Sequence, residues 1–128
     1  MWYNYNDEYL IFEGKYINGD KNGKGKEYEN GKLIFDGEYL NDKKWKGKKY
    51  VNGKLEFEGE YYDDKKWTGK GYDIIGNIIY ELKNGNGKMK EYDDFGNLKF
   101  EGEYVNGQKN GKGKDYDWVG NLYLKENI

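Results

Sequence analysis

The sequence predicts an all-β protein, an elongated single-layer antiparallel sheet built from successive β-hairpins. Three observations predict it: a unit of about 22 residues recurs along the chain, its core alternates with a period of two, and Asn-Gly or Gly-Asn pairs stand before the cores. A unit of this length is too short for two helices and their turns. Each unit is therefore expected to form one hairpin, joined to the next by another turn.

The core of the unit reads Leu-x-Phe-x-Gly-x-Tyr, as in residues 33–39. Its alternation places Leu33, Phe35, Gly37 and Tyr39 on one face of an extended strand. A degenerate copy carries Leu82 where the others have glycine. The copies lie at 10–16, 33–39, 55–61, 78–83 (degenerate) and 98–104.

The turn pairs before the cores mark the hairpins, because asparagine and glycine readily adopt the positive φ of tight turns. They are Asn30-Gly31, Asn52-Gly53, Gly76-Asn77, Gly96-Asn97 and Gly120-Asn121. We expect one repeat domain over residues 1–128, with residues 1–9 as an N-terminal cap and 117–128 as a C-terminal cap, since exposed sheet edges attract further strands.

Composition limits the chemistry of the chain. Only 35% of the residues are hydrophobic, which argues against a thick two-layer core, but 19% are aromatic, which argues against disorder. Cysteine, histidine and serine are missing, so thiolate, imidazole and serine-triad catalysis and the usual zinc ligands are excluded. We expect no enzyme, no cofactor, no metal site and no small-molecule substrate.

Charge is balanced along the chain, with 22 lysines against 24 acidic residues and a net charge of −2. Nucleic acid is not expected as a partner. The negative charges of Asp63 and Asp64 offset the positive charge of the nearby lysines, and the chain has no arginine. Neither a bilayer-spanning run nor a signal-peptide core is visible. A cytoplasmic protein is expected.

Carboxylates flank the core glycine in every clear copy except the first, as Asp36 and Glu38 flank Gly37. Paired carboxylates can act as acid and nucleophile in glycosidases. Because these carboxylates recur opposite lysines, we interpret them as partners in cross-strand carboxylate–lysine pairs on a solvent-exposed face. The core glycines are interpreted as structural positions that let a neighbouring aromatic ring lie over the backbone. They are Gly14, Gly37, Gly59 and Gly102.

The run Phe-Glu-Gly-Glu-Tyr-x-Asn-Gly-x-Lys-Asn-Gly-Lys-Gly at residues 100–113 resembles the MORN (membrane occupation and recognition nexus) repeat. The resemblance covers nearly the whole chain. The sequence departs from the family pattern at Asn22 and Asn110, where histidine is usual, and in having tyrosine rather than tryptophan after Gly-Glu. The resemblance implies a curved or twisted ribbon of hairpins used for protein interaction, self-association or attachment near membranes.

Aromatic side chains are the candidate interaction surface, because aromatic residues dominate binding hot spots. The candidates are a tyrosine stripe (Tyr16, Tyr39, Tyr61 and Tyr104) and two loop-end anchors (Trp45 and Trp67). The alternative is that these rings stack on each other as the core, and for the tyrosines it is the favoured interpretation. The predicted function is a non-catalytic scaffold that binds a protein partner or another copy of itself. Lysines beside Trp45 and Trp67 keep a peripheral membrane or anionic phospholipid-binding module open as the alternative.

Overall fold

The computed structural model describes residues 2–4, 10–92, 97–116 and 122–126, and these residues form strands and turns without a helix. The strands are β1 (Trp2–Asn4), β2 (Leu10–Ile17), β3 (Asp20–Glu29), β4 (Lys32–Leu40), β5 (Lys43–Val51), β6 (Lys54–Tyr62), β7 (Lys65–Tyr72), β8 (Ile78–Leu82), β9 (Gly87–Tyr92), β10 (Leu98–Val105), β11 (Gln108–Tyr116) and β12 (Leu122–Glu126).

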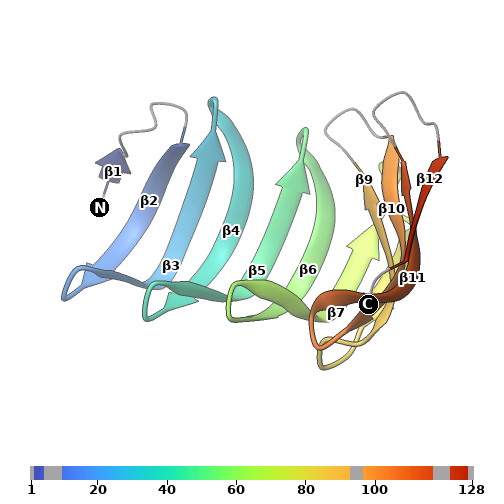
Figure 1. Cartoon of the computed structure of the whole chain (residues 1–128). Helices are drawn as coiled ribbons and strands as arrows, with labels where there is room; N and C mark the ends of the chain where they lie inside the picture. The colour runs from blue at the N-terminus through green and yellow to red at the C-terminus, as the bar shows by residue number, and fades with distance from the viewer. Residues whose placement is uncertain (1, 5–9, 93–96, 117–121, 127–128) are drawn as a thin grey trace.

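Strands β1 to β8 form one antiparallel sheet and β9 to β12 a second, and within each sheet every strand pairs with the next along the chain (Figure 1). This confirms the predicted all-β array of hairpins. The array is interrupted between β8 and β9, which are linked only by a bridge between Lys83 and Asn86. The interruption falls in the degenerate repeat, and there the chain bends so that the second sheet lies at an angle to the first.

Two of the predicted turns have the expected backbone at both residues. Asn30 and Gly31 adopt φ of 51° and 80°, and Asn52 and Gly53 adopt 49° and 77°. These left-handed values fit two-residue hairpin turns. In the Gly76-Asn77 pair only Gly76 has a positive φ, of 95°. Gly96 and the whole Gly120-Asn121 pair lie outside the described residues. Within the predicted caps, β1 pairs with β2 and β12 with β11, while residues 1, 5–9, 117–121 and 127–128 lie outside the description.

One row of glycines crosses six strands of the first sheet, each glycine opposite the next. The row comprises Gly14, Gly25, Gly37, Gly47, Gly59 and Gly69. It ends where Gly69 faces Leu82, and in the second sheet Gly102 faces Met89. Both Leu82 and Met89 are buried. The glycine row thus stops one strand before the sheet is interrupted.

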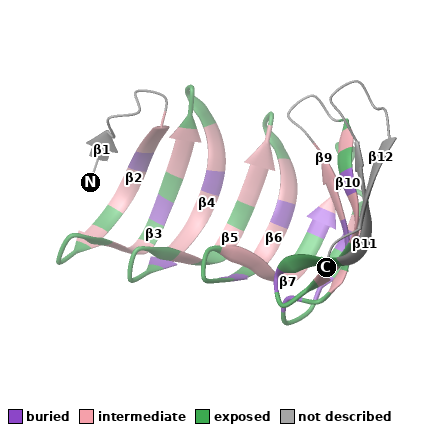
Figure 2. Ribbon diagram, viewed as in Figure 1, coloured by how far each residue is buried: buried purple, intermediate pink, exposed green. Residues whose placement is uncertain are grey.

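Phenylalanine rings cover the glycine row on one side of the sheet, which we call the aromatic face. Phe12 meets Tyr39 edge to face at 5.1 Å between ring centroids, and Phe35 meets Tyr61 at 5.5 Å. Edge-to-face contacts of this kind stabilise beyond the area they bury. Among the residues whose burial is described, the buried side chains are Phe12, Phe35, Tyr39, Phe57, Tyr61, Tyr80, Leu82, Met89 and Phe100 (Figure 2).

The prediction that Leu33 shares this face is wrong. The pairing register of β3 and β4 shifts between Glu27 and Tyr28, which leaves Ile34 as an extra residue of a bulge. A bulge reverses the alternation of the strand beyond it. Leu33 therefore stays outside the buried cluster and lines a surface hollow with Tyr50.

The opposite side, which we call the charged face, carries the carboxylates and lysines that flank the glycine row. Their pairing alternates in sign from strand to strand: Asp36 faces Lys48, and Lys48 faces Glu58 on its other side. A row on the other flank of the glycines follows the same rule, with Glu38 opposite Lys46 and an Nζ–Oε2 distance of 3.7 Å. The cross-strand charge pairing read from the sequence is present in the structure.

Candidate interaction surface

The tyrosine stripe lies in the core rather than on an open surface. Tyr39 is 2% exposed and Tyr61 is 8% exposed, while Tyr16 and Tyr104 are partly buried and pack against the same cluster. Each ring contacts phenylalanine rings, as Tyr39 contacts Phe12 and Phe35. As an interaction surface the stripe is therefore a wrong prediction, and its alternative, stacking within the core, is what the structure shows.

Exposed apolar side chains lie near the turns at both edges of the first sheet: Ile74, Ile75 and Ile78 are at one edge, and a row on successive strands is at the other, on the charged face. Ile17, Leu40 and Tyr62 each follow a tyrosine of the stripe, so alternation turns them to the charged face. With Trp45 they are between 39% and 64% exposed. We call Ile17, Leu40, Trp45, Tyr62 and Trp67 the apolar edge row.

Trp45 occupies a bulge of β5. The register with β4 shifts between Glu38 and Tyr39, so Trp45 has no partner between Lys44 and Lys46. The Nζ of Lys46 lies 4.4 Å from the centroid of the Trp45 ring, and Lys46 is paired with Glu38 on the charged face. Trp45 is thus an exposed ring with a cation over it.

Trp67 occupies the equivalent bulge of β7 but is partly covered. Its ring lies 4.9 Å from that of Tyr62, and it packs against the turns at Gly85 and Gly107. The backbone oxygen of Trp67 also accepts a hydrogen bond from the Gly85 N–H at 2.7 Å. The two tryptophans therefore differ: Trp45 is an open anchor, and Trp67 also supports neighbouring turns.

Successive turns at this edge are joined by side-chain acceptors. The Lys21 N–H donates to Asp42 Oδ1 and the Lys44 N–H donates to Asp64 Oδ1, both at 3.0 Å. Asp42 and Asp64 themselves adopt positive φ of 73° and 62° at turn positions. A hydrogen bond from Lys43 to Asp63 at 2.5 Å also lowers the pKa of that carboxyl. These contacts hold the apolar edge row in a fixed spacing.

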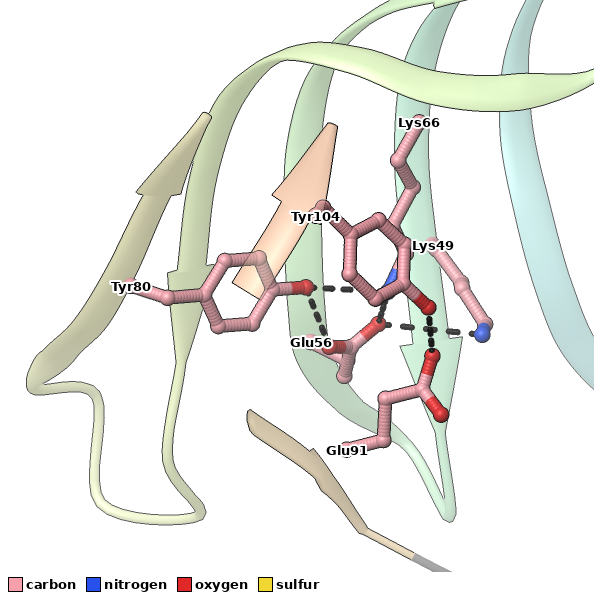
Figure 3. Close-up of polar contacts among 6 residues, drawn as sticks. All are labelled: Lys49, Glu56, Lys66, Tyr80, Glu91 and Tyr104. Carbon is pink, nitrogen blue, oxygen red and sulfur yellow. Dashed lines mark hydrogen bonds and ion pairs between the residues drawn. The ribbon is translucent and has the colours of Figure 1, made fainter. Parts of the chain in front are cut away.

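A polar cluster lies on the aromatic face, where the second sheet meets the first (Figure 3). Lys66 donates to Glu56 at 2.7 Å and contacts the Tyr80 hydroxyl at 2.9 Å, and that hydroxyl donates to Glu56 at 2.6 Å. The side chains of Lys66 and Glu56 are each only 12% exposed. From the second sheet, the Tyr104 hydroxyl donates to Glu91 at 2.5 Å beside this group.

Burial and charge act in opposition within the cluster. Burial lowers the pKa of Lys66 to about 8 although Glu56 offsets part of the effect. Burial alone would raise the pKa of Glu56, but Lys66 and Lys49 outweigh it and lower that pKa. Burial, with the Glu56 carboxylate, raises the pKa of Tyr80 well above its ordinary value. At neutral pH the cluster is an ion pair with neutral hydroxyls.

Tyr61 has a buried hydroxyl without a hydrogen-bond partner among the described residues. In the neighbouring unit, Tyr39 donates to Glu27, which lies opposite Phe35. The equivalent position opposite Phe57 is Lys49, which cannot accept a hydrogen bond. The substitution of lysine at this point of the repeat therefore explains the unsatisfied hydroxyl.

Sequence reasoning missed Ile17, Leu40, Tyr62, Glu56 and Lys66. The first three were visible as the residue that follows the tyrosine in each core. Glu56 was visible as a departure from Ile34, its counterpart in the preceding repeat. Burial of Lys66 had no sequence signal, because its neighbours Glu56 and Tyr80, and Glu91 of the second sheet, come from other strands.

The described part of the chain holds no group of three or more acidic side chains placed to bind a metal ion. It also contains no helix of the length and apolarity needed to cross a bilayer. No family model matches the sequence, and a search of curated proteins finds no similar one.

Proposed function

We propose that this chain is a non-catalytic, MORN-like scaffold that binds a protein partner through the apolar edge row on its charged face. The observation that carries the proposal is the set of large apolar side chains left exposed on an otherwise charged surface. Large apolar groups grouped on a polar surface mark interaction sites, and tryptophan and tyrosine are favoured at their centres.

The platform supports this role because its shape is set by neighbouring repeats. Each hairpin contacts the next through the glycine row, the ring contacts and the turn acceptors. Arrays of this kind are rigid and present side chains at regular spacing. Binding to such a surface needs little reorganisation, which favours affinity.

The buried ionisable groups are consistent with a structural rather than a chemical role. Lys66 is held by Glu56 and Tyr80, and it also lies 5.2 Å over the ring of Phe57. Its lysine equivalents in the first two repeats, Lys21 and Lys44, also lie over phenylalanine rings. Because the lysine at this position packs over a phenylalanine ring in successive repeats, its role is to stabilise the repeat array.

The proposal is tested by quantitative crosslinking in an extract of the source cells, comparing the wild type with Trp45→Ala/Tyr62→Ser. The matched control is Ile74→Ser/Ile75→Ser, since those isoleucines are also exposed but lie in the turn at the other edge of the sheet. We expect specific crosslinks to disappear with the first variant and persist with the control. Equal crosslinking by all three proteins would contradict the proposal.

A peripheral membrane function is the second candidate, favoured by the exposed Trp45 with Lys46 over its ring. Acidic side chains alternate with the lysines on the same face, which weakens attraction to anionic lipid. Flotation with neutral and phosphoinositide-containing vesicles, at low and physiological salt, separates the two. Salt-sensitive flotation lost in Trp45→Ala/Trp67→Ala would favour the membrane function.

A further inference from the structure

Like charges on the charged face form stripes that run along the strands. Two side chains of one sign flank the glycine of each strand, and the sign changes on the next strand. Thr68 on β7 is the one neutral member from β3 to β7. The stripes are Lys24 and Lys26 (β3), Asp36 and Glu38 (β4), Lys46 and Lys48 (β5), Glu58 and Glu60 (β6), and Thr68 and Lys70 (β7).

Neighbouring stripes are separated by the strand spacing of roughly 4.8 Å, so the alternating pattern has a period of about 9.6 Å. A partner that matches this period over several strands needs the same spacing and the opposite sign. The same sheet in another copy of this chain has that strand spacing. When that sheet is displaced by one strand, each of its charged stripes lies over a stripe of opposite sign.

We propose that a second copy of this chain docks on the charged face, with a two-fold axis parallel to the strands and between β5 and β6. This proposal rests on the proposed function, because it names the partner of the same surface. The axis places the basic stripe of β5 over the acidic stripe of β6 in the partner, and the reverse. It likewise places Asp36 of β4 over Lys70 of β7, while Glu38 of β4 comes over the neutral Thr68.

The same axis superposes the apolar edge rows. Because the axis runs along the strands, side chains keep their distance from the turn edge and exchange strands. Trp45 of β5 then meets Tyr62 of β6 in the second copy, and Leu40 of β4 meets Trp67 of β7. One operation therefore satisfies both the charges and the apolar groups, as an isologous interface requires.

The charged face is open to such a copy. The second sheet approaches the aromatic face, where Tyr104 and Glu91 lie beside Glu56 (Figure 3). The turns at Gly85 and Gly107 cover part of Trp67 at the edge of this face, and a surface hollow spans its central strands from Asp36 to Glu60. Since stacked sheets are rotated by their twist, the match is expected over the central strands β4 to β7.

Exposed ion pairs contribute little individually and are screened by salt. The dimer is therefore expected to be concentration-dependent and weaker at high salt. Sedimentation velocity of the full chain should show a species of twice the 15.2 kDa monomer mass at low salt. A monomer at all concentrations up to about 0.5 mM, at low salt, overturns the proposal.

Reversing the charges on β5 or on β6 tests the two-fold arrangement directly. Lys46→Glu/Lys48→Glu makes both central stripes acidic, and Glu58→Lys/Glu60→Lys makes both basic. Each variant alone should dissociate at least about tenfold more readily than the wild type. Mixed together, the two variants should form a heterodimer, because acidic β5 then faces basic β6 and acidic β6 faces basic β5.

Circular dichroism and thermal melting establish that each charge variant is folded before mixing. If a charge variant is not folded, a variant without charge changes still tests the interface. Leu40→Ser/Tyr62→Ser removes exposed side chains only and should weaken the dimer at least about tenfold. The control Ile74→Ser/Ile75→Ser should leave the dimer unchanged.

The outcomes separate this proposal from the function on which it rests. Two folded charge variants that fail to associate on mixing overturn the two-fold arrangement, as does a dimer indifferent to Leu40→Ser/Tyr62→Ser. A monomeric wild type that still gives Trp45-dependent crosslinks to another protein overturns the second copy as partner and leaves the scaffold function supported.

Discussion

The ring of Phe35 lies directly over Gly37, so that a Cβ added to this glycine would come within 2.7 Å of Cζ of the ring. The backbone of the next strand is closer still, because the Lys46 carbonyl oxygen is the nearest atom and the Cα of Gly47 lies at 2.7 Å. Packing of the phenylalanine ladder therefore depends on the missing side chains of the glycine row.

Gly37→Val should destabilise the array by about 3 kcal/mol, because overpacking forces the ring and the neighbouring strand apart. Urea unfolding measures the loss. Gly53→Asn is the control: Gly53 occupies a turn with φ of 77° and open space, and asparagine tolerates that backbone. Equal stability of Gly37→Val and the wild type would refute the packing role.

The Glu56–Lys66 pair should behave as a coupled unit. Glu56→Ile or Lys66→Met alone should cost about 3 kcal/mol, since each leaves a largely buried charge with poorer partners. The double variant should lie close to the wild type, because Ile34 and Ile79 already occupy the equivalent bulge position in other repeats. A double-mutant cycle measures the coupling, and additive losses would contradict it.

Lys66 should also make stability depend on alkaline pH. Its pKa in the folded chain is about 8, below the ordinary 10.5, so the unfolded chain binds more protons between these values. This group alone therefore raises the free energy of unfolding as pH increases from about 8 to 10.5. Comparing urea unfolding of the wild type and Lys66→Met across pH 7 to 10 isolates the effect. Parallel pH profiles would show that Lys66 is not desolvated.

Asp64 should stabilise the turn edge through its acceptor. Asp64→Ala removes the hydrogen bond to the Lys44 N–H and places alanine at a positive φ of 62°. The expected loss is about 2 kcal/mol. Asp64→Asn keeps both the acceptor and the tolerance of this backbone, so it should melt within a few degrees of the wild type. If both variants melt alike, the hydrogen bond contributes nothing.

Four tyrosines should resist ionisation in the folded chain. Burial is the largest cause that raises the pKa of Tyr39, Tyr61, Tyr80 and Tyr104, and carboxylates add to it. A raised pKa in the folded state means that this contribution to stability is lost as pH rises above about 10. In a spectrophotometric titration these tyrosines should ionise together with unfolding. Reversible ionisation near pH 10 in the folded protein would contradict their burial.

The sequence by itself determined the hairpin array. The recurrence of Leu-x-Phe-x-Gly-x-Tyr and the Asn-Gly pairs predict strands and turns, because both signals are local: side-chain alternation and the φ of a turn depend on adjacent residues. The cross-strand charge pairs followed from the same recurrence, since equal units pair in the same register. Glycine beneath Phe35 also followed from alternation within one strand.

Only the tertiary structure decided which side chains stay exposed. Bulges at Ile34 and Trp45 reversed the alternation and moved Leu33 and Trp45 to the charged face. The bend at the degenerate repeat brought Tyr104 and Glu91 beside the largely buried Lys66, which the sequence does not distinguish from the other lysines. Register shifts and the meeting of sheets depend on contacts between distant residues, so a pattern read along one strand does not contain them.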